Sequence, residues 1–270
     1  MRNYTSVVCI KQVPDTKKVT GQAMKADGTI NRAALPAIFN PEDRNALEAA
    51  LQVKERCGGK VIAITMGLPT ASAILREALY RGADEAYLVT DRKAAGSDTL
   101  ATSYILSQAV RKFDPDFVFC GRQAIDGDTA QTGPQIAEKL DFAAVTYLER
   151  IVEVKEDGDR SSVTVVRDIG TGVETSRVKL PALFTVTEKF GELRPANVRK
   201  VMKFKAFEPQ ALSCDDIGCE SDRCGFAGSP TSVNRIQSVV LAGGEYKAVE
   251  PTDEGVSNLI KELTDEHTIG

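Results

Sequence analysis

Tryptophan is absent from the 270-residue sequence, and histidine occurs once, as His267 near the C-terminal end. Hydrolytic sites of the serine or cysteine type need a well-placed histidine as base, so the sequence argues against that class of enzyme. A surplus of basic residues is also missing: the net charge is -4, whereas nucleic-acid-binding domains are normally basic. We therefore expect no nucleic-acid partner.

Long apolar runs are missing as well. No stretch approaches the roughly 18 apolar residues that a membrane-spanning helix needs. The opening segment MRNYTSVVCIKQVPD has too short an apolar run for a signal peptide. We therefore expect a cytoplasmic protein with no direct membrane insertion. The remaining composition, 42% hydrophobic and 27% charged, is that of an ordinary globular protein.

The six cysteines are expected to be free thiols in a reducing compartment. Three of them, Cys214, Cys219 and Cys224, stand at equal intervals in SCDDIGCESDRCG. Zinc and iron–sulfur sites usually take four protein ligands, often with two cysteines two residues apart, and no histidine lies near these three. We predict no metal site here, and the sequence leaves the role of the three cysteines open.

The first 140 residues alternate short β-branched segments with longer amphipathic ones. The pattern predicts strands at 5–11, 60–65, 86–90 and 117–120, and helices at 42–56, 71–81, 98–112 and 129–140. Such alternation indicates an α/β fold with a doubly wound, mainly parallel sheet of the Rossmann-like, adenine-nucleotide-binding kind. Its ligand crevice is then expected at the carboxyl ends of the strands.

The pattern changes after about residue 143. Apolar and polar residues alternate over 143–180, which predicts an antiparallel ribbon, and 181–187 is expected to return to the main sheet. Residues 191–270 have little periodicity until a helix at 253–264, with Thr252 as its N-cap. We therefore divide the chain into a nucleotide-binding domain, 1–190, and an arm, 191–270. An arm with little core of its own needs a partner subunit to lie on.

The segment with the most closely spaced polar residues and glycines is CGRQAIDGDTAQTGP, residues 120–134, which begins where a predicted strand ends and continues into a predicted helix. Backbone amides and the helix dipole at such a place suit a phosphate. Gly127 permits a close backbone approach, and Asp128 or Thr129 is expected to cap the helix. A polar helix cap without a ligand is the alternative. The segment has neither the Rossmann glycine spacing nor a P-loop lysine, so nucleotide hydrolysis is not favoured.

Other loops are expected at the same crevice. Lys11 in CIKQVPD either neutralises a phosphate or is a surface lysine. Asn40 and Pro41 suit the N-cap and first position of a helix. Gly67, after Met66, allows a close approach. The polar residues at 96–99 open another helix. The convergence of these loops favours an adenine-nucleotide ligand over a set of unrelated caps.

These segments carry a resemblance to the β subunit of an electron-transfer flavoprotein. The matching motifs are VVCIKQVPD, IFNPEDRNALEAAL, ITMGLPTASAILREALYRGADEAYLVTD, GRQAIDGDTAQTGP and, later, CGFAGSPTSV. The resemblance implies a heterodimer with an α subunit that holds a redox-active FAD, while the β subunit holds a second nucleotide. Ordinary members hold AMP there, and electron-bifurcating members hold FAD. DGDTAQ and TDRKAAGSDTLATS resemble the bifurcating kind.

The bifurcating resemblance implies that NADH reduces the β-subunit flavin and that electrons then pass to the α-subunit flavin and to ferredoxin. An acyl-CoA dehydrogenase-like protein is the other expected partner. No general acid or base is named, because the flavin supplies the chemistry; whether the chain counts as an enzyme or as a carrier subunit is left open. An AMP-holding β subunit that serves dehydrogenases is the alternative within the family, and an adenine-nucleotide sensor module is the alternative outside it.

The expected nucleotide contacts come from the resemblance, with Lys11, Gly67 and Arg122 added from their positions in the sequence. The set is Cys9, Lys11, Asn40, Pro41, Glu42, Asp43, Met66, Gly67, Asp98, Thr99, Thr102, Arg122, Gln123, Ala124, Ile125, Asp126, Gly127, Asp128, Thr129, Ala130, Gln131, Thr132, Gly133 and Pro134. The loop 24–32 is expected beside the same site. Val198 corresponds to an apolar anchor for a dehydrogenase partner; its alternative role is to cover the underside of the arm.

Overall fold

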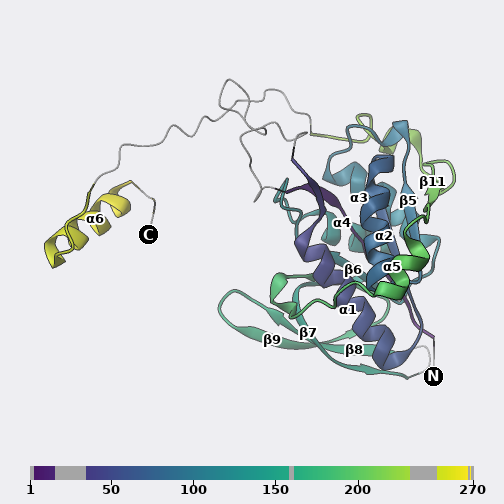
Figure 1. Ribbon diagram of the computed structural model, residues 1–270, viewed down its shortest axis with the longest axis horizontal. Coiled ribbons are helices and arrows are strands. Elements are labelled where there is room, and N and C mark those ends of the chain that lie inside the picture. The colour runs from purple at the N-terminus through teal and green to yellow at the C-terminus, as the bar shows by residue number, and fades with distance from the viewer. Residues whose placement is uncertain (1–2, 16–34, 158–160, 232–247, 267, 269–270) are drawn as a thin grey trace.

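The computed structural model describes residues 3–15, 35–157, 161–231, 248–266 and 268 (Figure 1). The expected loop 24–32 and His267 lie outside these residues. A nine-stranded sheet forms the centre of the fold, in the order β11-β5-β4-β1-β6-β10-β7-β8-β9. Every pairing from β11 to β7 is parallel, and β7, β8 and β9 pair antiparallel. The predicted fold class is therefore confirmed.

The strands of the parallel part begin and end close to the predicted positions. They are β1 (Thr5–Cys9), β4 (Lys60–Met66), β5 (Glu85–Val89), β6 (Phe117–Gly121) and β10 (Ala182–Val186); a further parallel strand, β11 (Gln210–Leu212), was not predicted. The ribbon consists of β7 (Ala143–Lys155), β8 (Ser162–Asp168) and β9 (Val173–Lys179). The predicted return of 181–187 to the main sheet is confirmed by β10, which lies between β6 and β7.

Two helices cover each face of the parallel strands. The helices are α1 (Pro41–Cys57) and α2 (Ser72–Arg81) on one face, and α3 (Thr99–Arg111) and α4 (Thr132–Leu140) on the other. Successive strand residues alternate between the two cores, as Val7 and Val8 do, because side chains of a strand point to opposite faces. Phe117, Phe119 and Phe184 stack in the core between the sheet and helices α1 and α2.

Some elements were not predicted. A small antiparallel sheet joins β2 (Gln12–Pro14) to β3 (Ala37–Phe39), and four short 3₁₀ helices occur: η3 (Pro69–Ala71), η4 (Arg92–Ala94), η5 (Glu188–Phe190) and η6 (Ser221–Arg223). Two short elements, α5 (Val198–Phe204) and β11, fall within the predicted arm. Helix α5 packs on α2, and β11 extends the main sheet beside β5. The first part of the arm therefore belongs to the α/β body; the domain boundary itself stays a prediction.

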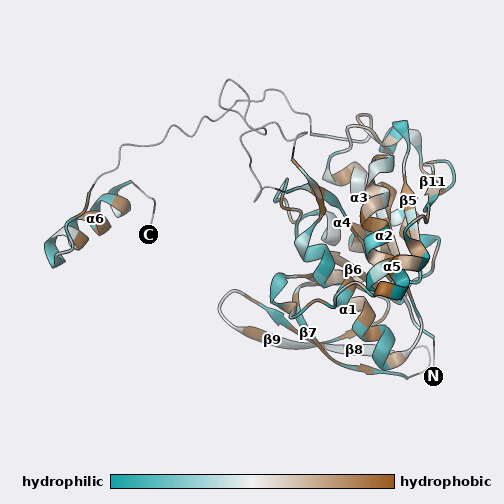
Figure 2. Ribbon diagram, in the orientation of Figure 1, coloured by the Kyte–Doolittle hydropathy of each residue, from teal (hydrophilic) through white to brown (hydrophobic). Residues whose placement is uncertain are grey.

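The C-terminal helix α6 (Asp253–Asp265) lies apart from the α/β body (Figure 1). Thr252 accepts a hydrogen bond from the amide of Gly255, which confirms it as the N-cap. The helix carries hydrophobic and hydrophilic residues along its length (Figure 2), with Val256 and Ile260 exposed. Among the described residues, no helix combines the length and the apolar character that crossing a membrane requires.

Candidate functional site

The carboxyl ends of β1, β4 and β6 lie side by side, as the parallel pairing demands. Cys9 pairs in register with Ile64 of β4 and with Cys120 of β6. The segments that follow these strands, together with the start of α1, therefore meet at one edge of the sheet. This is the crevice in which the predicted residues were expected to converge.

Asp43, in the first turn of α1, ties two of these strand ends together. Its carboxylate accepts hydrogen bonds from the backbone amides of Lys11, at 2.8 Å, and Gly121, at 2.9 Å. Burial raises the pKa of this carboxyl from 3.8 to about 7, although hydrogen bonds from Asn40, Lys11 and Gly121 oppose the shift. Asp43 is thus a buried support of the loops rather than a group at the surface of the site.

Gly121 makes that support possible because it has no side chain. A Cβ at this position would lie 2.4 Å from an Asp43 carboxylate oxygen and 2.9 Å from the Asp43 amide nitrogen. Gly121 was not among the predicted site residues. The sequence signal for it was a glycine directly after a buried strand, which is a position where close backbone approach is common.

Asn40 occupies the N-cap position of α1, and Pro41 is the first residue of the helix, as predicted. The Asn40 side chain makes no cap hydrogen bond, however. Its amide nitrogen donates to the carbonyl oxygen of Gln123, at 2.9 Å, and its side-chain oxygen accepts from the amide of Ile125, at 3.2 Å. The predicted N-cap position is therefore confirmed, but the side chain bonds the loop after β6 and not the first turn of the helix. Asn40 is fully buried beneath that loop.

Glu42 pairs with Arg122 on the same loop. The closest nitrogen–oxygen distance is 2.9 Å, and Glu42 also accepts from the Gln123 amide at 2.8 Å. The hydrogen bond that Arg122 donates to Glu42 raises the pKa of Arg122 above its usual value. The Arg122 guanidinium lies 5.7 Å from the centre of the Tyr147 ring. Its charge is therefore already balanced, and direct contact between Arg122 and a phosphate stays a prediction.

The loop after β6 lies on the buried residues Asn40, Glu42 and Asp43 and has an exposed tip formed by Gly127, Asp128 and Thr129. The Lys11 ammonium lies 2.7 Å from an Asp126 carboxylate oxygen, and the Gln123 side chain donates to Asp128 at 2.9 Å. Asp128 and Ala130 have φ values of 49° and 52°, in the left-handed region. The loop is thus held in one shape by contacts at both of its ends.

Helix α4 begins at Thr132 and not at 129, as the sequence had predicted, because the left-handed backbone at Asp128 and Ala130 is incompatible with a helix. Gln131 is the N-cap residue, and it makes no side-chain cap hydrogen bond. The prediction that Asp128 or Thr129 caps the helix is therefore wrong. In the part of the chain that the structure describes, the first amides of α4, at the carboxyl edge of the sheet, have no side-chain cap.

This edge fits the phosphate groups of a nucleotide in two respects. The uncapped helix start offers backbone donors and the positive end of the helix dipole. At Gly127, a Cβ would find no heavy atom within 4 Å among the described residues, so a ligand has room to approach the backbone there. The remaining loop residues Ala124, Ala130 and Pro134 are half-buried, and Gly133 is buried against Thr185.

The start of α3 is joined to this loop. The Thr99 hydroxyl donates to the side-chain oxygen of Gln131 at 2.9 Å. One oxygen of the Asp98 carboxylate caps α3 through the amides of Leu100 and Ala101. The Thr102 amide donates to the Asp98 carbonyl oxygen within the first turn. Thr99 is therefore brought to the site, whereas Asp98 acts as a helix cap.

An apolar floor closes the strand ends on the α3 and α4 side. Cys9 and Cys120 are buried there, and Met66 packs against the same cluster while remaining half-exposed. A hydrogen bond with Cys9 and burial both raise the pKa of the Cys120 thiol. The Gly67 amide donates to the Val89 carbonyl oxygen at 3.0 Å, which fixes the backbone after β4. All six cysteines are free thiols, as expected.

Val198 lies in a different region, at the first turn of α5. Its side chain is 75% exposed, so it does not cover the underside of the arm. Arg194 anchors the preceding segment through Glu48, with a nitrogen–oxygen distance of 2.7 Å. Sequence reasoning missed this ion pair, since the two residues are far apart along the chain.

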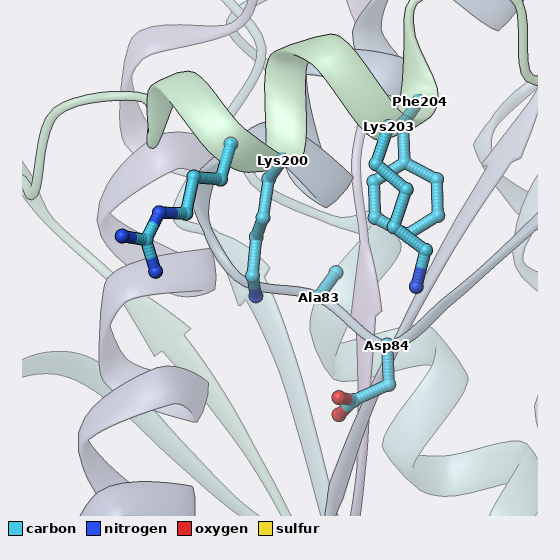
Figure 3. A pocket seen from close by; sticks show the side chains of 6 residues that line it. Ala83, Asp84, Lys200, Lys203 and Phe204 are labelled. Carbon is cyan, nitrogen blue, oxygen red and sulfur yellow. The ribbon is translucent and has the colours of Figure 1, made fainter.

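A cavity of about 290 Å³ lies beside α5, near the amino end of β5 and thus at the opposite edge of the sheet from the loop at 121–133. Figure 3 shows Lys200, Lys203 and Phe204 extending from the helix toward Ala83 and Asp84. Arg199 also lines the cavity, so its wall is mainly basic. Apart from the lysines spaced along LRPANVRKVMKFK, nothing in the sequence specifically indicated this cavity.

Comparisons with known proteins agree with the resemblance seen in the sequence. A family model described as "Electron transfer flavoprotein domain" matches residues 27–211. "Electron transfer flavoprotein subunit beta" of Thermoanaerobacterium thermosaccharolyticum is 43% identical, over 97% of this chain and 99% of the relative. "Caffeyl-CoA reductase-Etf complex subunit CarD" of Acetobacterium woodii is 42% identical, over 97% and 99%. "Protein FixA" of Azorhizobium caulinodans is 44% identical, over 85% and 83%. The chain therefore belongs to the electron transfer flavoprotein family, as a β subunit.

Proposed function

We propose that the loop at 121–133, with the ends of β1 and β4, binds the adenosine diphosphate part of FAD. The observation that carries this proposal is the start of α4, where the N-cap residue Gln131 leaves the first amides without a side-chain cap. Those amides and the helix dipole favour a diphosphate. Asn40, Glu42 and Asp43 hold the loop from below, so the donors are positioned before a ligand arrives.

FAD is favoured over AMP by the length of the polar rim, by which we mean the loop at 121–133 together with the start of α3. The hydrogen bond between Thr99 and Gln131 continues the rim from the loop to the start of α3. A monophosphate occupies only part of such a rim, whereas a dinucleotide extends along it. The segment TDRKAAGSDTLATS, which includes Thr99 and Thr102, also resembles the bifurcating kind of β subunit.

When bound, FAD supplies the capacity to accept an electron pair from NADH and to pass electrons singly to two acceptors. The residues of this chain bind and orient the group and exclude water from one side of it. The acceptors we propose are the FAD of the α subunit and ferredoxin. The relative CarD is named as a subunit of a caffeyl-CoA reductase complex, which supports an acyl-CoA dehydrogenase-like protein as a further partner.

We propose that the C-terminal part of the chain binds the α subunit. Helix α6 is amphipathic, and its apolar residues Val256 and Ile260 are exposed on a helix apart from the α/β body (Figures 1 and 2). Helices of this kind are stabilised by burying their apolar side against another surface. The exposed Val198, with basic residues next to it, is the proposed anchor for the dehydrogenase-like partner.

Analysis of the bound nucleotides tests the proposal. The heterodimer is purified, its nucleotides are released by denaturation, and they are separated and quantified against protein. We expect two FAD per αβ pair. One FAD with one AMP would identify the AMP-holding form and reject FAD at this site. A homodimer that binds ATP and carries no flavin would reject the electron-transfer function as well.

Replacing Lys11 by alanine tests its proposed contact with phosphate. The side chain is 49% exposed and pairs with Asp126, so the free energy of unfolding is expected to change by less than about 1 kcal/mol. Loss of one charge-assisted contact is expected to weaken nucleotide binding roughly tenfold. Lys60→Ala is the matched control, because Lys60 is 47% exposed and pairs with Glu85 at the other edge of the sheet. Equal nucleotide affinities of the two variants would contradict a role for Lys11.

A further inference from the structure

The three cysteines for which the sequence indicated no role are brought together after β11. The sulfur atoms of Cys214, Cys219 and Cys224 all lie within 4.8 Å of one another. Cys214 and Cys224 are buried, and Cys219 is half-buried. The cluster is thus closed on the protein side and reachable past Cys219.

The separation of the sulfur atoms suits a single metal ion. A zinc–thiolate bond is about 2.3 Å long, which places two sulfurs about 3.8 Å apart in a tetrahedral site and about 4.0 Å apart in a trigonal one. The sulfur atoms lie at most 4.8 Å apart, so each pair has to approach by no more than about 1 Å to bind one zinc ion. Iron–sulfur clusters are usually held by four cysteines, whereas this site has three. Thiolates select soft ions such as zinc and copper(I) over magnesium or calcium.

The backbone around the cluster is held in place by hydrogen bonds within the loop and to neighbouring elements. The Cys219 amide donates to the Cys214 carbonyl oxygen at 2.9 Å, and the Cys214 amide donates to Asp91 at 3.0 Å. The Glu220 amide donates to the Tyr104 hydroxyl at 3.0 Å. The loop is therefore anchored to the N-cap of η4 and to α3 on either side of Cys219, and these contacts hold the three thiols close together.

We propose that Cys214, Cys219 and Cys224 bind one zinc ion through their three sulfur atoms, with a water molecule as the fourth ligand. Binding converts three thiols to thiolates, so three protons are released and three zinc–sulfur bonds form, with no change of oxidation state. The water enters from the side of Cys219, which is the half-exposed member of the cluster. This proposal departs from the expectation of no metal, which was based on ligand number and spacing.

The ion would stabilise more than its own loop. Beyond Cys224, the same segment reaches the start of α3: the Ser229 hydroxyl accepts from the Asp98 amide at 2.8 Å, and the Thr231 hydroxyl donates to the Asp98 carboxylate at 2.7 Å. Asp98 caps the helix whose first residue, Thr99, contacts Gln131. Zinc would thus hold the segment that packs against the end of the candidate nucleotide site. The binding of zinc itself does not depend on the identity of that nucleotide.

The test uses the full chain purified with its α subunit under reducing conditions. The complex is loaded with zinc chloride, desalted and analysed for metal by mass spectrometry. We expect close to one zinc per β chain above the content of the triple serine variant. Cys219→Ser, at the half-exposed position, is expected to lose most of the zinc while keeping the fold. Cys57→Ser is the matched control, because this half-buried thiol on α1 belongs to the other core, and it should keep its zinc.

Two further measurements make the result decisive. Cobalt(II) in place of zinc should give thiolate-to-metal charge-transfer absorption that Cys219→Ser loses and Cys57→Ser retains. Zinc should also protect three thiols from alkylation. The proposal is overturned if the unaltered complex binds no more zinc or cobalt than Cys219→Ser. It is also overturned if zinc fails to protect the three thiols of the reduced complex from alkylation.

Discussion

Replacing Gly121 by alanine is expected to lower the free energy of unfolding by about 1 to 3 kcal/mol and to release the nucleotide that we propose binds at this edge of the sheet. The new Cβ would lie 2.4 Å from an Asp43 carboxylate oxygen and 2.9 Å from both the Asp43 nitrogen and the Glu42 carbonyl carbon. Two of these neighbours are backbone atoms, so the start of α1 and the end of β6 must separate. Urea unfolding and the nucleotide content after gel filtration measure the two effects.

Gly127→Ala is the matched control on the same loop. No heavy atom among the described residues lies within 4 Å of its ideal Cβ, so the free energy of unfolding is expected to change by no more than about 0.5 kcal/mol. Nucleotide affinity should still fall, because the methyl group occupies the space left for the ligand. Destabilisation equal to that of Gly121→Ala, or full nucleotide occupancy in both variants, would contradict the proposed geometry.

The second large effect is a dependence of stability on pH through Asp43. The folded protein keeps the proton of this carboxyl up to a pH of about 7, because burial raises its pKa, whereas the unfolded chain releases it near the ordinary pKa of 3.8. The folded state therefore binds more protons between these values, and stability falls as pH rises through that window. The contribution of Asp43 to this fall is on the order of 4 kcal/mol.

Asp43→Ala should remove this pH dependence. At pH 5 the variant is expected to be less stable than the unaltered chain by about 2 to 4 kcal/mol, because the amides of Lys11 and Gly121 lose their acceptor. At pH 8 the difference should shrink, because the unaltered chain then contains a buried, ionised carboxylate. Urea unfolding curves at both pH values measure the difference.

Asp98→Ala is the control for the pH series. Burial raises the pKa of Asp98, but hydrogen bonds from Ala101, Thr231 and Leu100 outweigh it and hold the pKa below the ordinary value of 3.8. The stability that this carboxylate contributes is present above pH 3.8 and is lost at lower pH. Between pH 5 and pH 8 the cost of Asp98→Ala should therefore stay constant. A constant cost for Asp43→Ala over the same range would contradict the assigned role of Asp43.

The predictions that succeeded depend on local patterns. Alternation of β-branched and amphipathic segments located four of the parallel strands and their helices, and it located the ribbon at 143–180. The order of the loops along a parallel sheet then placed Asn40, Lys11 and the loop at 121–133 at one edge. Periodicity is visible in a single sequence because burial on one face repeats with the period of the element.

The features that the sequence did not predict arise from competition between distant groups. Asn40 has the residue type and position of an N-cap, yet its side chain bonds the loop 83 residues further along the chain. Asp128 and Thr129 have the composition of helix caps, but the left-handed backbone at Asp128 and Ala130 delays α4 to Thr132. Segments near β11 read as an arm because three-residue strands carry too little pattern to be recognised.

The sequence by itself determined the fold class, the family and the edge of the sheet at which the nucleotide contacts were expected, because each of these follows from the residue order within short segments. Only the tertiary structure decided that Glu42 balances Arg122, that Asp43 holds two strand ends, and that three evenly spaced cysteines converge within 4.8 Å. Those arrangements depend on contacts between segments far apart in the chain, and residue spacing carries no information about such distances.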